Sequence, residues 1–208
     1  DVLIRDEAQN HTLQEAYIDF LRGMFKGTEP SRYIALAYLT GILPIKKLKT
    51  QSALNNFEEF TMLDAGRMAP YVGFTEEEVF HALEENGLSD EKETVRCWYD
   101  GFSFGKRKDI YNPWSITKYL DTGEYGTYWA DTSGNMLISN LIRRSPAKIK
   151  TEMEDLLNGR VICTELDEQV IFEQLGRKRG AIWSLMLASG YLKVDRYEMD
   201  NRTGKWLA

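Results

Sequence analysis

The feature that most constrains the fold is a short apolar run that ends in a turn. Residues 33–47 read YIALAYLTGILPIKK, in which seven mostly apolar residues end at Thr40-Gly41. A continuous apolar run between turn residues is typical of a parallel strand that is buried on both faces. In open α/β sheets, ligands bind at the carboxyl ends of such strands. Thr40 is therefore a candidate ligand contact, because a polar residue at a strand end often serves a nucleotide phosphate.

Composition is that of an ordinary globular protein and argues against several classes of function. The 208 residues are 43% hydrophobic and 28% charged, as expected for one large or two small domains. The net charge of −6 disfavours broad binding to nucleic acids or anionic membranes. Cys97 and Cys163 form no disulfide framework, and no run approaches the ~18 apolar residues of a membrane-spanning helix. We therefore expect a cytoplasmic protein with no membrane partner.

Helix start and stop signals predict a mainly helical chain of class α/β to α+β. Thr75 and Glu78 form a capping box ahead of a helix that ends near Gly87, and Asn112-Pro113 opens another helix with a cap and a first-turn proline. The last residues, GYLKVDRYEM-DNRTG-KWLA, predict a β-hairpin. Further helices are predicted from Thr12 to about Gly27, with a face of Leu13, Tyr17, Phe20, Leu21 and Met24, and over 89–99, 133–143, 146–158, 165–175 and 181–189.

Several motifs of catalytic type fail because their context is wrong. Residues 101–105 match G-x-S-x-G, but that turn needs a preceding strand, a following helix and a later histidine. The preceding residues look helical, and the two histidines, His11 and His81, lie upstream. Neither histidine has a ligand-type partner at the spacing of a zinc site, so no metal site is predicted. A glycine-flanked aromatic turn is the better interpretation of residues 101–105.

Nucleic-acid and nucleotide sites also lack their usual sequence support. The basic clusters, such as Lys46-Lys47-Lys49, are predicted to be solvated loop or helix-end residues. The dense aromatic residues of 98–129 favour a helix and turn core over a base-stacking surface. The sequence contains no G-x-x-x-x-G-K-[ST] loop, whose backbone N–H groups and lysine would hold a phosphate. Thr40 therefore has no complete phosphate site to serve in this chain.

Five motifs in a fixed order resemble the bacterial AAA-ATPase-like family. They are YIALAYLTGILPIKK with QSALNNFEEFTML, then GFTEEEV, WYDGFSFG, IYNPWSI and LASGYLKV, and they span nearly the whole chain. In fuller members this module is often followed by a PD-(D/E)XK-type nuclease domain. The resemblance implies a remnant of a P-loop NTPase core at 1–72 and a helical lid at 73–124. A helical, winged-helix-like extension that ends in a hairpin would occupy 125–208.

The resemblance also assigns roles to two residues. Asp1 aligns with the last acid of the Walker B run and would be a nucleotide-binding residue, with the phosphate loop upstream of it. Thr40 aligns with the sensor-1 residue, a catalytic position that orients the attacking water or contacts the γ-phosphate. The alternative is that Thr40 only caps its strand and bonds the Gly41 turn. ATP and Mg²⁺ would bind to the longer parent protein, and we expect none of either in this fragment.

Two functions remain open at this point. The chain is either part of an ATP-driven switch or motor, or a non-catalytic module that binds a protein or DNA on a degenerate ATPase scaffold. Intact upstream phosphate-loop motifs would favour the first function. Unpaired strand edges would favour self-association of the fragment, and nucleic acid would be a partner through the parent's nuclease-type domain.

Overall fold

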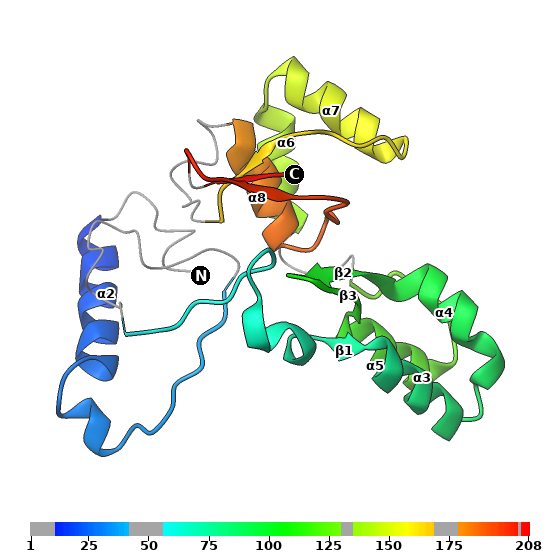
Figure 1. Ribbon diagram of the computed structural model, residues 1–208, viewed down its shortest axis with the longest axis horizontal. Coiled ribbons are helices and arrows are strands. Elements are labelled where there is room, and N and C mark those ends of the chain that lie inside the picture. Colours follow the sequence, from blue (N-terminus) through cyan, green and yellow to red (C-terminus); the bar gives the residue numbers. More distant parts are fainter. Residues whose placement is uncertain (1–10, 42–55, 130–134, 169–178, 204) are drawn as a thin grey trace. The chain divides into compact units, whose positions relative to one another are not determined.

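The computed structural model describes residues 11–41, 56–129, 135–168, 179–203 and 205–208 (Figure 1). Its longer helices are α2 (His11–Phe25), α3 (Glu76–Glu85), α4 (Lys92–Tyr99), α5 (Pro113–Thr122), α6 (Asn135–Arg144), α7 (Ala147–Leu157) and α8 (Arg179–Ala188). Short 3₁₀ turns lie at Pro30–Arg32, Gly66–Tyr71 and Ser89–Glu91. The strands are β1 (Phe74–Thr75), β2 (Asp100–Phe104), β3 (Arg107–Tyr111), β4 (Glu165–Leu166), β5 (Glu198–Asp200) and β6 (Lys205–Leu207).

The chain divides into two compact units. The central unit contains residues 60–144 and 190–195, and the flanking unit contains residues 1–59, 145–189 and 196–208. Both described sheets are small and antiparallel, with strand orders β1-β3-β2 and β4-β6-β5. The α+β class is therefore confirmed at this coarse level. No helix of the described residues combines the length and apolar composition that crossing a bilayer requires.

The helices of the central unit begin at the capping residues that the sequence predicts. The backbone N–H of Glu78 donates to Thr75 Oγ1 at 3.3 Å, and the Thr75 N–H donates to Glu78 Oε2 at 2.8 Å. This reciprocal capping box starts α3 immediately after β1. Asn112 Oδ1 accepts from the N–H of Trp114 at 2.9 Å and starts α5 directly after β3. Two strands of one sheet are thus each followed at once by a capped helix.

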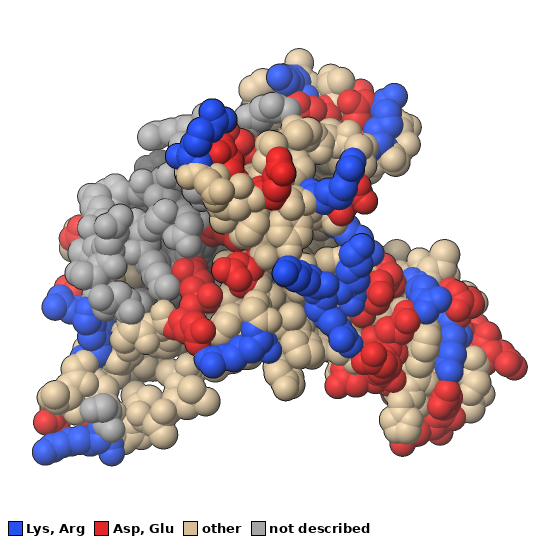
Figure 2. Space-filling model, viewed as in Figure 1, with Lys and Arg blue, Asp and Glu red and all other residues tan. Residues whose placement is uncertain are grey.

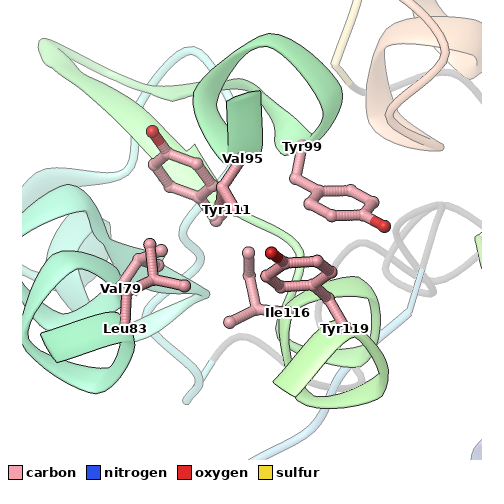
Figure 3. Packing of buried hydrophobic residues seen from close by; sticks show 7 residues of the cluster. All are labelled: Val79, Leu83, Val95, Tyr99, Tyr111, Ile116 and Tyr119. Atoms are coloured by element: carbon pink, nitrogen blue, oxygen red, sulfur yellow. The ribbon is translucent and has the colours of Figure 1, made fainter. Parts of the chain in front are cut away.

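A single apolar cluster holds these elements together. Figure 3 shows side chains of α3, α4 and α5 pointing toward one another, with Tyr111 of β3 among them. Tyr111 is fully buried at the end of β3, and its helical partners recur at spacings of three or four residues. The cluster consists of Val79, Leu83, Val95, Tyr99, Tyr111, Ile116 and Tyr119. The predicted use of the aromatic residues as core is confirmed for Tyr99, Tyr111 and Tyr119, whereas Trp98 and Trp114 are exposed.

The flanking unit contains a second small sheet beside an apolar helix. The hairpin β5–β6 pairs Met199 with Trp206, and β4 adds to the other edge of β6. Helix α8 lies so close to β4 that a Cβ at Gly180 would stand 2.6 Å from the carbonyl oxygen of Glu165. Residues 181–187 of α8 are all buried. The predicted hairpin is therefore confirmed in a shortened form.

The predicted buried strand at 33–39 is not formed in the structure. Residues 34–41 have no strand pairing, and no parallel pair occurs among the described residues. Leu36 and Tyr38 are 88% and 69% exposed, where the prediction required burial. A central parallel strand needs neighbours on both edges and cover on both faces, and the described residues supply neither. The remnant of a P-loop core is thus not confirmed.

Two smaller predictions need correction. The helix predicted over 165–175 is replaced at its start by β4, because Glu165 points outward and Leu166 inward in a pairing with β6. Its remainder lies mostly outside the described residues. In α2 the buried apolar residues are Ile18 and Leu21, whereas Phe20, placed on the predicted face, is 59% exposed.

Candidate functional site

The two site residues predicted from the sequence are not brought together in the described residues. Thr40 lies in an irregular extended segment, and its side chain is exposed. Asp1 lies outside the described residues. The role of Thr40 as a sensor residue therefore stays a prediction.

The segment that ends at Thr40 is unusual because it is apolar, exposed and without strand pairing among the described residues. From Ala35 to Thr40, no backbone hydrogen bond joins the segment to another described residue. Exposed apolar side chains lose the stabilisation of burial, which is about 1.5–3 kcal/mol for each fully buried large side chain. A segment of this kind resembles a sheet edge that lacks its partner strand.

A second candidate site joins two motifs that are far apart in the sequence. Gly190 lies against the ring of Phe102 in β2, where an added Cβ would stand 3.0 Å from Cζ and still closer to Cε1. Three residues later, Lys193 Nζ lies 3.8 Å from Asp100 Oδ2. The WYDGFSFG and GYLKV segments are therefore neighbours within the central unit.

Glu76 is the centre of a polar network between α3, α4 and β3. Its Oε2 accepts from Arg96 Nε at 2.8 Å and from the Tyr111 hydroxyl at 3.1 Å, and Arg96 Nη2 also lies at 2.8 Å. Arg96 Nη1 donates to both carboxylate oxygens of Glu93. Burial, followed by the bond to Glu76, raises the pKa of Tyr111, so this phenol stays protonated and donates. The network fixes α4 to the sheet.

Asp100 is a partly buried carboxyl group with a raised pKa. Its side chain is 16% exposed, and burial raises its pKa against the lowering effect of Lys193. The charge of Asp109 and a hydrogen bond with that carboxyl raise the pKa further. Two carboxyl groups share such a bond only when one of them carries the proton. Asp109 itself has φ of 57°, a left-handed conformation that Asp tolerates better than most residues.

Three buried polar atoms near these motifs have no hydrogen-bond partner among the described residues. They are Asp100 Oδ1, Ser103 Oγ and the Tyr191 hydroxyl. Burial alone raises the pKa of Tyr191, so its hydroxyl remains neutral. These groups offer hydrogen bonds but no activated nucleophile.

The described residues around these motifs supply ion pairs and hydrogen-bonding groups, which can bind and position a partner. No group of three histidine, cysteine, aspartate or glutamate side chains in the described part of the chain has the geometry of a metal site. Residues 101–104 lie in β2, which continues through Gly105-Lys106 into β3. A nucleophile elbow would require a helix there, so the motif is not an elbow. The predicted glycine-flanked aromatic turn over 101–105 is corrected, because residues 101–104 form a strand and the chain turns only at Gly105-Lys106.

Sequence reasoning identified both motifs but did not pair them. The signal that could have joined them is Lys193, a lone cation in the otherwise apolar stretch GYLKV, opposite the lone acid of YDGFSFG. That signal is weak, because the chain has 26 lysine and arginine residues. Comparisons of the chain with protein-family models, curated proteins and solved structures give no match. The family assignment from the motifs therefore stays a prediction.

Proposed function

We propose that the chain is the part of an AAA-ATPase-like protein that follows the nucleotide-binding half. In this proposal residues 34–40 form a strand of a parallel sheet whose neighbours lie in that half. The central unit is a rigid helical lid, and ATP and Mg²⁺ bind only to the longer protein. The chain by itself neither binds ATP tightly nor hydrolyses it.

The observation that carries this proposal is the exposed, unpaired segment that ends at Thr40. Its sequence has the pattern of a strand buried on both faces, yet Leu36 and Tyr38 are exposed. A sequence pattern typical of a buried strand is consistent with these exposed side chains only if another part of the protein pairs with this backbone and covers them. Thr40 would then stand at the carboxyl end of a complete sheet, where nucleotides bind.

The network of Glu76, Arg96 and Tyr111 supports the lid role. A lid transmits nucleotide state when it moves as one body, and this network joins α3, α4 and β3 by charge-assisted hydrogen bonds. The apolar cluster of the same elements lies beneath it. A unit fixed in this way keeps its shape while its position changes.

The alternative function, a DNA-binding module, receives less support from the flanking unit. The chain order α7, β4, α8, β5 and β6, with β6 in the middle of its sheet, supports a winged-helix-like extension. In DNA-binding helix-turn-helix proteins the second helix presents side chains to base edges. Residues 181–187 of α8 are buried and uncharged, so these seven residues offer no side chain for this role.

The experiment that tests the proposal compares this chain with a longer protein that contains it and a G-x-x-x-x-G-K-[ST] loop. Calorimetry with MgATP should give no micromolar binding to the chain alone and clear binding to the longer protein. Micromolar binding by the chain alone would refute the proposal.

Hydrogen exchange supplies the structural half of the test. Amides of residues 35–40 should exchange rapidly in this chain and slowly in the longer protein, because a sheet would then bond them. Amides of β3 and α5 serve as the control, since the central unit protects them in both proteins. If the amides of residues 35–40 exchange equally rapidly in both proteins, these residues form no strand in the longer protein, and that part of the proposal is wrong.

A further inference from the structure

Helix α4 presents a tryptophan that has one free aromatic face. Trp98 is 50% exposed, and its ring stacks on Tyr125 with a centroid distance of 5.5 Å and an interplanar angle of 27°. Tyr125 is held in turn by stacking on Tyr119 of the core at 4.5 Å. Tyr125 thus supports Trp98 from one side only, as a rigid platform.

A carboxylate without a cation lies on the same side of α4. Glu91 precedes Trp98 by two helical turns, and its Oε2 accepts from the Tyr125 hydroxyl at 2.8 Å. The two cations of α4 are engaged elsewhere, because Lys92 pairs with Glu84 and Arg96 pairs with Glu76 and Glu93. Among the described residues, no lysine or arginine pairs with Glu91.

The surroundings of this platform are strongly acidic. Residues 74–99 contain eight aspartate and glutamate residues and two lysine and arginine residues. Figure 2 shows acidic side chains gathered on the part of the molecule where Figure 1 places α3, α4 and α5. Such a surface attracts cationic partners and repels nucleic acids.

The other exposed tryptophan of the central unit provides a contrast. Trp114 of α5 is 55% exposed, but the Lys118 ammonium lies over its ring at 5.2 Å from the centroid. The face of the Trp114 ring that could bind a cation is therefore already occupied by Lys118 of the same helix. Trp98 is similarly exposed, but among the described residues no cation lies over its ring.

We propose that the surface formed by Trp98, Tyr125 and Glu91 docks an arginine-containing basic segment of another polypeptide. An arginine guanidinium would lie flat on the free face of Trp98, and a second cation of the same segment would pair with Glu91 beyond Tyr125. Arginine fits the Trp98 ring better than lysine because its planar, weakly hydrated group stacks on aromatic rings. This docking goes beyond the proposed ATPase role and does not depend on it.

The test uses a fluorescein-labelled peptide of alternating arginine and serine, titrated with the full chain and followed by fluorescence anisotropy. Trp98→Ala should weaken binding by about 3- to 30-fold, the range expected for loss of a cation–π contact. Glu91→Gln should weaken it by a similar factor and should also reduce its dependence on salt. A peptide of alternating lysine and serine should bind the wild-type chain less tightly than the arginine peptide.

Trp114→Ala is the matched control and should change the affinity by less than about twofold, because Lys118 occupies that ring. Circular dichroism checks that each variant keeps its fold, and Glu91→Gln keeps the test decisive if Trp98→Ala unfolds. Equal losses for the two tryptophan variants, or equal affinity of the arginine and lysine peptides, would show general attraction to an acidic surface. Either result would overturn the proposal, as would unchanged affinity in folded Trp98→Ala or in Glu91→Gln.

Discussion

Replacement of Gly190 by alanine tests the contact that joins residues 190–195 to the central unit. Gly190 has φ of 76° and lies against the ring of Phe102. In the left-handed region an alanine costs about 1–2 kcal/mol relative to glycine. The added Cβ would stand 3.0 Å from Phe102 Cζ and closer to Cε1, and overpacking of this kind costs a further 1–3 kcal/mol, roughly. We therefore expect Gly190→Ala to lower the free energy of unfolding by about 2–5 kcal/mol.

Gly87→Ala separates the two contributions. Gly87 has nearly the same backbone conformation, with φ of 71°, but an added Cβ there would meet nothing within 4 Å. Its replacement should therefore cost only the conformational part, about 1–2 kcal/mol. Both variants are measured by urea unfolding followed by far-UV circular dichroism, with the m value checked for two-state behaviour.

A double-mutant cycle identifies the clash itself. Shortening Phe102 to alanine removes the ring that the new methyl group meets, so the double variant should be more stable than the sum of the single effects predicts. A coupling energy of at least about 1 kcal/mol is expected for residues in direct contact. If Gly190→Ala costs no more than Gly87→Ala, or if the coupling is absent, the packing of residue 190 on Phe102 is refuted.

Two further predictions concern titration and the sensor position. The pKa of Asp100 is raised in the folded state, first by burial, so its contribution to stability is fully present below the ordinary pKa and is lost as pH rises through the folded value. The wild-type chain should therefore lose stability as pH rises above about 4, and Asp100→Asn should remove this loss. The check is the urea midpoint of unfolding as a function of pH; the same pH dependence in variant and wild type would contradict the prediction. In the longer protein, Thr40→Val should leave nucleotide affinity nearly unchanged and lower ATP turnover on the order of a hundredfold, whereas wild-type turnover in the folded variant would exclude Thr40 from the active site.

The local elements of the central unit could be predicted because their signals are short-range. The capping box of Thr75 and Glu78 and the Asn112-Pro113 start place α3 and α5 from a few adjacent residues. Side chains at these positions satisfy helix N–H groups irrespective of the remaining fold. The helix over 92–99 was likewise predictable, because α4 buries Val95 and Tyr99 at helical spacing.

The elements that the sequence did not predict depend on pairing over long distances. The helix predicted from residue 165 is replaced by β4, because Glu165 and Leu166 pair with β6, about forty residues later in the chain. The contact of Gly190 with Phe102 also could not be predicted locally. Glycine permits another group to approach closely, but the sequence around it does not indicate which residue does so. The apolar run at 33–39 was predicted as a buried strand and forms none in the structure. A strand requires neighbouring strands, and no local signal tells whether they are present.

Segment 34–40 and the surface of Trp98 and Glu91 should bind their partners through different interactions. Segment 34–40 has no charged side chain, so a strand that pairs with it gains backbone hydrogen bonds and apolar burial, which added salt does not weaken. The surface of Trp98 and Glu91 attracts cations, and exposed charge interactions weaken as the Debye length falls from about 10 Å at 0.1 M salt to 3 Å at 1 M. Self-association through residues 34–40 should therefore persist in high salt, whereas capture of a basic segment by α4 should be lost. A single salt titration, with mass and peptide binding measured together, assigns each interaction to its surface.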